Sequence, residues 1–212
     1  MSLDEKRRQK KLAKKASKRK AKLSDKKDAL ISESAGAQNI ALALNSPVHE
    51  CIVPEGLFEV GIGNILISRK MPNGNVAFSI FLLDVFCLGV KNAYFFIMSH
   101  SEYDDKIRRI KVDADFKRLP PECIRKLVES AEAYAGHLGF NPHPDYRSAR
   151  KIFGDIDAEK CPMHLEFGKD GRPLFVSGPN DTQAKCMKIM ETLTKSCGPG
   201  GFHYMIGVTP GI

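Results

Sequence analysis

Residues 61–87 read GIGNILISRKMPNGNVAFSIFLLDVFC, and this stretch decides the fold class. The Asn73-Gly74 pair in its middle is typical of the tight turn of a β-hairpin, and apolar residues flank it on both sides. We therefore expect one strand around Ile65 and a returning strand from Val76 to Cys87. The returning strand is apolar on both faces, which predicts a central strand covered by helices on two sides.

Helices are expected further along the chain. After Pro120-Pro121, apolar residues recur at spacings of three, four and seven up to Gly139, which is the pattern of an amphipathic helix. A shorter helix is expected over residues 146–153. Another should follow Asp181 or Thr182, because either side chain can cap a helix N-terminus.

Three further segments are expected to be strands. The apolar residues 93–98 fit a helix or a strand, and we favour the strand. Asp170-Gly171 lies between residues 165–167 and 174–176 and predicts a second hairpin, and a last strand is expected over residues 202–208. The order predicts an α+β domain, with a mixed or antiparallel sheet built from two hairpins plus a C-terminal strand and packed by about three helices.

The positive charge of the chain is concentrated at its N-terminus. The whole chain has 33 Lys and Arg and 25 Asp and Glu, of which residues 1–28 hold 13 and 4, so the remaining 184 residues hold 20 and 21. We expect a basic tail over residues 1–30 that is partly helical or disordered, and a small, polar linker over residues 31–46. Residues 47–212 should form a single α+β domain.

The tail has the composition of a segment that binds polyanions. Basic side chains occupy every face of a helix drawn through it, so it has no apolar stripe for docking on a core. Nucleic acid is the favoured partner, RNA more than DNA because of its abundance; about six phosphate contacts would give log K against log salt a slope of roughly −5. A solubilising tail and an anionic-membrane contact are the alternatives, and the absence of aromatic residues disfavours the membrane. The expected phosphate-binding side chains are Lys6, Arg7, Arg8, Lys10, Lys11, Lys14, Lys15, Lys18, Arg19, Lys20 and Lys22.

No segment predicts export or membrane insertion. Residues 1–30 lack the apolar core of a secretory signal. The longest apolar run, residues 76–90, is too short to span a bilayer and is interrupted by Asp84. The six cysteines include no Cys-x-x-Cys pair, and their apolar neighbours indicate buried, reduced thiols. We therefore expect a cytoplasmic protein.

Asp84 is the most unusual residue of the expected domain, because a buried strand carries its charge. As a functional group it could bind a divalent metal with other carboxylates, or act as a general base whose pKa is raised by desolvation. As a structural group it would lie at the strand end and accept hydrogen bonds from the turn at residues 89–92, or pair with Lys91.

Asp155 and Asp157 flank Ile156 beside Gly154, a spacing that resembles the start of a metal loop. No calcium-loop continuation follows, so a turn that ends a helix is the default interpretation. Together with Asp84 and Glu166 they could form a carboxylate cluster for two-metal phosphoryl chemistry. The histidines match no zinc motif, so no cofactor is predicted, and the divalent metal of this cluster stays an alternative.

Four segments, residues 61–69, 81–94, 153–157 and 167–173, together resemble a family of uncharacterised bacterial proteins. The resemblance covers roughly residues 55–208 and implies no activity. Some members of that family end in a small metal-binding module rich in Cys and His. This chain ends at Ile212 without such a module, so the resemblance implies no metal.

Two functions follow from these observations as hypotheses. The first is a nucleic-acid-associated, RNA-binding protein in which the tail supplies electrostatic attraction and the domain supplies shape or a protein contact. The alternative is a metal-dependent phosphodiester hydrolase, similar to a nuclease, with Asp84, Asp155 and Asp157 in its catalytic site. A scaffolding role stays open, and the sequence indicates no protein partner.

Overall fold

A computed structural model describes residues 39–112 and 114–206. The chain divides into two compact units, Met1–Leu42 and Ala43–Ile212. In the first unit the described residues are 39–42, which are helical, so the basic tail and its predicted phosphate contacts lie outside the described residues. In the second unit Ala43 is fully buried in the main core, although the sequence analysis assigns it to the linker. The extent of tail and linker stays a prediction.

The second unit is an α+β domain built on a five-stranded antiparallel sheet with the strand order β4-β3-β2-β1-β5. The predicted hairpin is confirmed: its two strands pair from Ile62 with Asp84 to Lys70 with Val76, and Gly74 takes the left-handed conformation with φ 81°. Residues 93–98 are part of a strand, as favoured from the sequence. The strands are β1 (Val48–Pro54), β2 (Ile62–Lys70), β3 (Asn75–Asp84), β4 (Gly89–Ser99) and β5 (Phe116–Arg118).

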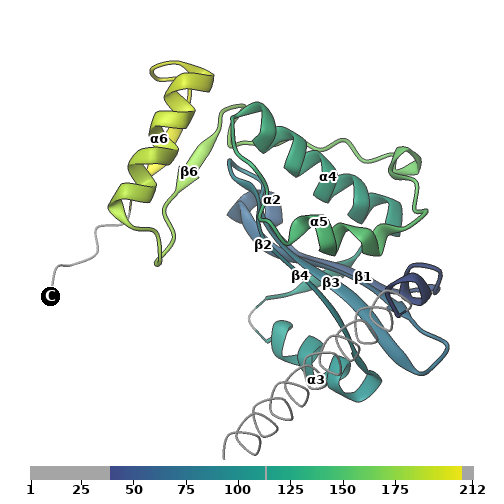
Figure 1. Cartoon of the computed structure of the whole chain (residues 1–212). Coiled ribbons are helices and arrows are strands. Elements are labelled where there is room, and N and C mark those ends of the chain that lie inside the picture. Colours follow the sequence, from purple (N-terminus) through teal and green to yellow (C-terminus); the bar gives the residue numbers. More distant parts are fainter. Residues whose placement is uncertain (1–38, 113, 207–212) are drawn as a thin grey trace, which may run out of the picture. The chain divides into compact units, whose positions relative to one another are not determined.

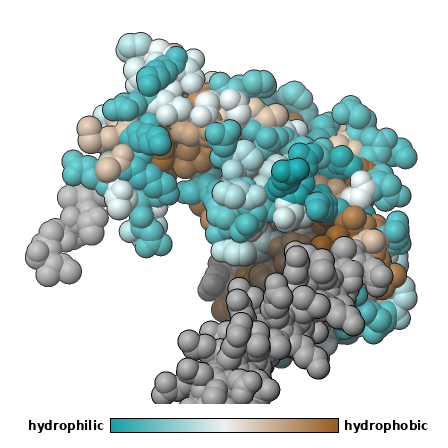
Figure 2. Space-filling view, in the orientation of Figure 1, coloured by the Kyte–Doolittle hydropathy of each residue, from teal (hydrophilic) through white to brown (hydrophobic). Residues whose placement is uncertain are grey.

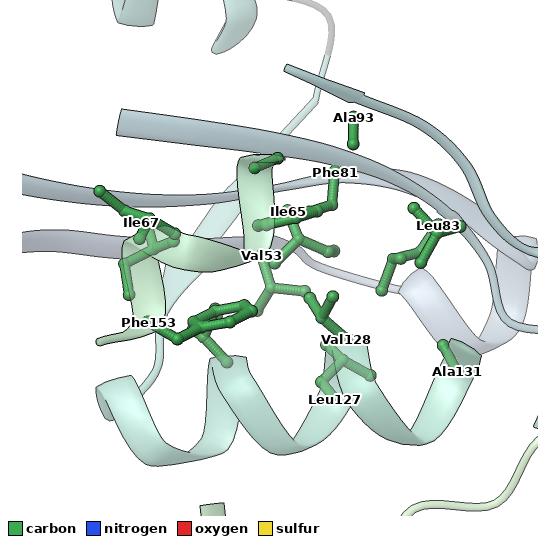
Figure 3. Close-up of a cluster of buried hydrophobic side chains, with 14 of the residues drawn as sticks. Val53, Ile65, Ile67, Phe81, Leu83, Ala93, Leu127, Val128, Ala131 and Phe153 are labelled. Atoms are coloured by element: carbon green, nitrogen blue, oxygen red, sulfur yellow. The ribbon is translucent and has the colours of Figure 1, made fainter. Parts of the chain in front are cut away.

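Helices cover both faces of β3, as the two-sided apolar pattern predicts (Figure 1). On one face lie α4 (Pro121–His137), α5 (Tyr146–Ala149) and the 3₁₀ helix η1 (Arg150–Phe153). Sheet residues such as Phe81 and Leu83 point towards Leu127 and Val128 of α4 and form the main core (Figure 3). The close approach of sheet and helix requires Gly89, because a Cβ there would lie 2.7 Å from the Ala131 carbonyl oxygen.

The opposite face carries α3 (His100–Ile110), a helix that the sequence analysis did not predict. A capping box of Ser99 and Glu102 starts it, and Tyr103 and Ile107 pack on the sheet. Glu50 of β1 anchors the helix by accepting hydrogen bonds from the Tyr103 hydroxyl and from Lys111 Nζ, each at 3.0 Å. Burial alone would raise the pKa of Glu50, but these hydrogen bonds and the nearby cations outweigh burial and lower it.

The predicted second hairpin is wrong. The last strand does lie within residues 202–208, as predicted, but it is not part of the main sheet. Asp170 and Gly171 do form a turn, with φ angles of 51° and 76°, but it closes only an isolated bridge between Lys169 and Arg172. Pro173 follows at once and has no N–H to continue a ladder. Instead β6 (Leu174–Val176) pairs in parallel with β7 (His203–Met205) in a separate two-stranded sheet.

The helix expected after Thr182 is confirmed as α6 (Gln183–Cys197), and Thr182 Oγ1 caps it by accepting from the Lys185 N–H at 3.3 Å. Its buried side chains Cys186, Ile189 and Leu193 pack with Phe175 of β6. Two short elements complete the domain, α2 (Leu57–Val60) and the 3₁₀ helix η2 (Ala158–Lys160). In the part of the chain that the structure describes, no helix is long and apolar enough to cross a membrane.

Two of the six cysteines are not reduced thiols, which corrects the expectation from the sequence. Cys123 in the first turn of α4 and Cys161 after η2 form a disulfide across a sequence separation of 38 residues. Cys51, Cys87 and Cys186 are buried free thiols, as expected. Disulfides persist mainly in oxidising compartments, so this one does not support the cytoplasmic location. That location stays a prediction.

Candidate functional site

A hollow of about 390 Å³ lies over α4, α5 and η1, and four of its eight lining residues are basic. Figure 2 shows hydrophilic side chains gathered over α4 and α5. Leu44, Phe153 and Gly154 contribute the less polar part of the lining. We call this site the basic hollow, and its charged side chains are Arg125, Glu129, Arg147, Arg150 and Lys151.

Helical spacing gathers these side chains although the chain holds them in two segments. Arg125 and Glu129 are four residues apart on α4, so they lie on the same side of that helix. Arg147, Arg150 and Lys151 follow the same three- and four-residue spacing where α5 continues into η1. Packing of both segments on the sheet then brings them to one site.

One carboxylate, that of Glu129, forms ion pairs with two of the four cations. Glu129 Oε1 accepts from Arg125 Nε and from Arg150 Nη2, each at 3.1 Å. Arg150 also lies over the ring of Tyr146, 5.3 Å from its centroid. Arg147 and Lys151 are exposed and have no ionic partner among the described residues.

A buried arginine supports the wall of the hollow. Arg69 of β2 is 4% exposed, and its guanidinium donates to the carbonyl oxygens of Ile152 at 2.8 Å, Phe153 at 2.9 Å and Ser46 at 2.7 Å. Burial lowers the pKa of Arg69 from its ordinary value, and the charge of Asp155 opposes this. Because Ile152 and Phe153 belong to η1, Arg69 fixes the segment that carries Arg150 and Lys151.

The basic hollow has the chemistry of a phosphate-binding surface. Guanidinium groups donate paired hydrogen bonds to phosphate oxygens, and a lysine ammonium adds a compact point charge. Four cations and one carboxylate line the hollow, whereas the residues after position 28 hold 20 basic and 21 acidic side chains in all. The charge is therefore concentrated locally in a domain that is close to neutral.

Asp84 lies at the end of β3, where its carboxylate is tied to the turn that follows. Its Oδ1 accepts from the backbone N–H of Phe86 at 3.1 Å and of Cys87 at 2.9 Å. Burial raises its pKa, while the charge of Lys91 and the backbone hydrogen bonds oppose that shift. Asp84 thus lies at a strand end and accepts hydrogen bonds from a turn, as expected if its role is structural. The turn is at residues 85–88, whereas residues 89–92 were expected.

Asp155 and Asp157 lie elsewhere, in the segment between η1 and η2. Asp155 has a 98% exposed side chain, 3.9 Å from Arg69 Nη2, and Asp157 caps η2 by accepting from the Glu159 N–H at 3.1 Å. Glu166 is also exposed and lies 3.7 Å from His164. Within residues 39–112 and 114–206, no three His, Cys, Asp or Glu side chains are grouped so that they could hold a metal ion.

We predict that Asp84→Ala and Asp84→Asn will differ in stability. The alanine variant leaves the Phe86 and Cys87 N–H groups buried without an acceptor and should lose about 2–3 kcal/mol of unfolding free energy. Asparagine keeps the Oδ1 acceptor, so its change should stay within about 1 kcal/mol. Urea denaturation at neutral pH measures both, and equal losses would contradict this role of Asp84.

The pH dependence of the same variants gives a second test. Because burial raises the pKa of Asp84 in the folded state, the folded protein binds this proton more tightly than the unfolded chain. Its contribution is therefore present in acid and is lost as pH rises from about 3.8 through the raised folded-state pKa. Asp84→Asn should lack this decline. If Asp84 served the hydrolase of the alternative hypothesis, the asparagine variant would instead lose phosphodiester cleavage.

The basic hollow could not be predicted from the charge of the domain as a whole, which is close to zero. The spacing of Arg147, Arg150 and Lys151 in a predicted short helix was the one available signal. Comparison of the chain with family models, with curated proteins and with solved structures found no match. The resemblance to a family of uncharacterised bacterial proteins therefore stays a hypothesis.

Proposed function

We propose that the protein is a nucleic-acid-associated protein that binds RNA through phosphate contacts. The basic hollow is the observation that supports this proposal, because it gives the near-neutral domain its own concentration of positive charge. The tail adds 13 basic side chains within residues 1–28 and would extend the contact along the polyanion. RNA is preferred to DNA on the ground of its abundance in cells.

Counterion release makes the proposal measurable. Each phosphate of a single strand that is neutralised by a cation of the protein makes the slope of log K against log salt steeper by about 0.7. Arg147 and Lys151 are the informative side chains, since they have no ionic partner among the described residues and can be replaced without breaking a pair in the domain. Both are exposed.

The test is fluorescence anisotropy of a labelled single-stranded oligouridine of about 20 nucleotides, titrated with the full chain at several salt concentrations. The Arg147→Gln/Lys151→Gln variant should bind more weakly and lower the slope by about 1.4. Lys188→Gln/Lys195→Gln removes the same charge from exposed positions on α6 and should leave the slope nearly unchanged. A chain without residues 1–30 measures the share of the tail.

Two outcomes would remove the proposal. The full chain could fail to bind the oligouridine at low salt, where electrostatic attraction is strongest. Alternatively, both double variants could weaken binding equally, which would mean that only total charge matters and that the basic hollow has no part in it.

A further inference from the structure

A second hollow, a groove of about 910 Å³, lies on the face of the sheet that carries α3. All five strands contribute to its floor, and α3 forms one wall. The groove exists because α3 covers this face only in part. Tyr103 and Ile107 bury the region around Phe78, while Ile62 and Tyr94 further along the sheet stay 40% and 46% exposed.

An aromatic pair forms part of the floor. Tyr94 and Phe96 occupy alternate positions of the edge strand β4, so their side chains lie on the same face of the sheet. Their rings are stacked, with centroids 5.9 Å apart and planes inclined by 20°. Phe96 in turn packs on Phe78, with centroids 5.2 Å apart, so the buried core supports the pair from below.

Hydrogen bonds fix the exposed ring of this pair. The Asn92 side-chain amide donates to the Tyr94 hydroxyl at 2.7 Å, and Asn92 Oδ1 accepts from the Ala93 backbone N–H at 2.9 Å. Tyr94 is therefore held at its tip by Asn92 and along its face by Phe96. A planar ligand would meet an aromatic surface that is already ordered, which reduces the entropy lost on binding.

The wall formed by α3 places cations beside this surface. Lys106 Nζ lies 4.7 Å from the Phe96 ring centroid, and Arg109 lines the groove one helical turn further on. Neither has an ionic partner among the residues that the structure describes. The carboxylates of the same wall are engaged, since Glu102 caps α3 at Ser99 and Asp105 pairs with Arg108 at 3.2 Å.

An ordered aromatic floor with cations at its edge matches the two parts of a nucleotide, a flat base and a phosphate. We propose that the groove binds unpaired nucleobases of single-stranded RNA, stacked on Tyr94 and Phe96, with Lys106 and Arg109 facing the phosphates. This inference rests on the proposed function and names the form of nucleic acid. Bases inside a duplex already stack on each other and cannot enter, whereas an unpaired base has a face to offer.

Asn64 of β2 adds a polar group to the groove. Its exposed side-chain amide carries a donor and an acceptor, which is what the edge of a base requires. Stacking itself tolerates every base, so the groove should show modest base preference at most. Discrimination between single strand and duplex should be much larger than discrimination between sequences.

The decisive experiment measures the full chain with single-stranded oligouridine and with an RNA duplex of equal length. Tyr94→Leu keeps an apolar side chain but removes the ring, and should raise Kd for the single strand by about 5- to 150-fold, the effect of stacking one base. Kd for the duplex and the salt slope should not change. Tyr204→Leu is the matched control, because Tyr204 is 54% exposed on β7 and does not line the groove.

Cross-linking gives a readout that a purely structural role of Tyr94 would not produce. Oligouridine with 5-iodouracil, irradiated in the complex, should form its adduct on the peptide that contains Tyr94 and Phe96. Unchanged melting of Tyr94→Leu would confirm that the variant is folded.

The two proposals fail in different ways. If Tyr94→Leu and Tyr204→Leu bind the single strand equally while Arg147→Gln/Lys151→Gln binds it more weakly, the groove inference is overturned and the basic hollow stands. Equal effects of Tyr94→Leu on single strand and duplex would overturn the groove as well. If the full chain binds neither RNA at low salt, both proposals are lost.

Discussion

Replacing Cys123 and Cys161 together with serine is expected to lower the free energy of unfolding by about 4 kcal/mol. The disulfide spans a sequence separation of 38 residues, and without it the unfolded chain gains the freedom of that loop. For a domain of this size the melting temperature should fall by about 8–15 °C. Thermal unfolding followed by circular dichroism under non-reducing conditions measures the change.

The control for this prediction uses a cysteine outside the disulfide. Cys197→Ser replaces a partly exposed free thiol and should change the melting temperature little. Addition of dithiothreitol should lower the melting temperature of the original chain and of Cys197→Ser, but not that of the double variant. A melting temperature of the original chain that does not respond to the reductant would contradict the role of this disulfide.

The disulfide also bears on the basic hollow. It joins the first turn of α4 to the segment after η2, and neighbouring side chains of α4 reinforce that junction. Arg125 donates to the carbonyl oxygens of Gly154 and Ile156, and Lys126 Nζ donates to the Cys161 carbonyl oxygen at 2.9 Å. Arg125 is therefore held by the same segment that the disulfide joins to α4.

Local signals in the sequence predicted the centre of the sheet. The hairpin of β2 and β3 needs only neighbouring residues, a turn that Gly74 permits and strands whose apolar pattern shows their burial. The helix α3 was missed because charged residues dominate it. Its apolar positions Tyr103, Ile107 and Ile110 have helical spacing, and Ser99 with Glu102 form a readable capping box.

Pairing over long distances could not be predicted in the same way. The Asp170-Gly171 turn has the expected backbone. However, β6 pairs with β7, which follows α6 in the chain, and not with residues 165–167. The disulfide between Cys123 and Cys161 depends likewise on how η2 packs on α4. Strand and cysteine patterns show what a segment requires, but several partners satisfy each requirement.

The candidate sites were hidden for related reasons. Tyr94 and Phe96 are part of an apolar run that reads as core, and their exposure depends on how much of the sheet α3 covers. The charge of the basic hollow disappears in the sum over the domain. The charge of Asp84 within an apolar strand can be seen in the sequence. The backbone N–H groups that donate hydrogen bonds to it can be seen only in the structure.

Arg69→Met is expected to lower the free energy of unfolding by about 3–5 kcal/mol, because it removes a buried guanidinium together with its three hydrogen bonds to backbone carbonyl oxygens. These hydrogen bonds go to Ser46, Ile152 and Phe153. Arg69→Lys keeps the charge but cannot reproduce the planar fork, so it should recover only part of the loss. Urea denaturation measures the series.

Lys70→Met is the matched control, since Lys70 is the exposed neighbour of Arg69 on β2, and its effect should stay within about 0.5 kcal/mol. Similar stabilities of Arg69→Met and Lys70→Met would show that the three hydrogen bonds of Arg69 add little to the stability of the domain. Arg69 also supports η1 and with it Arg150 and Lys151. At a temperature where Arg69→Met is still folded, it should therefore lower the salt slope of RNA binding although Arg69 itself is buried and touches no phosphate.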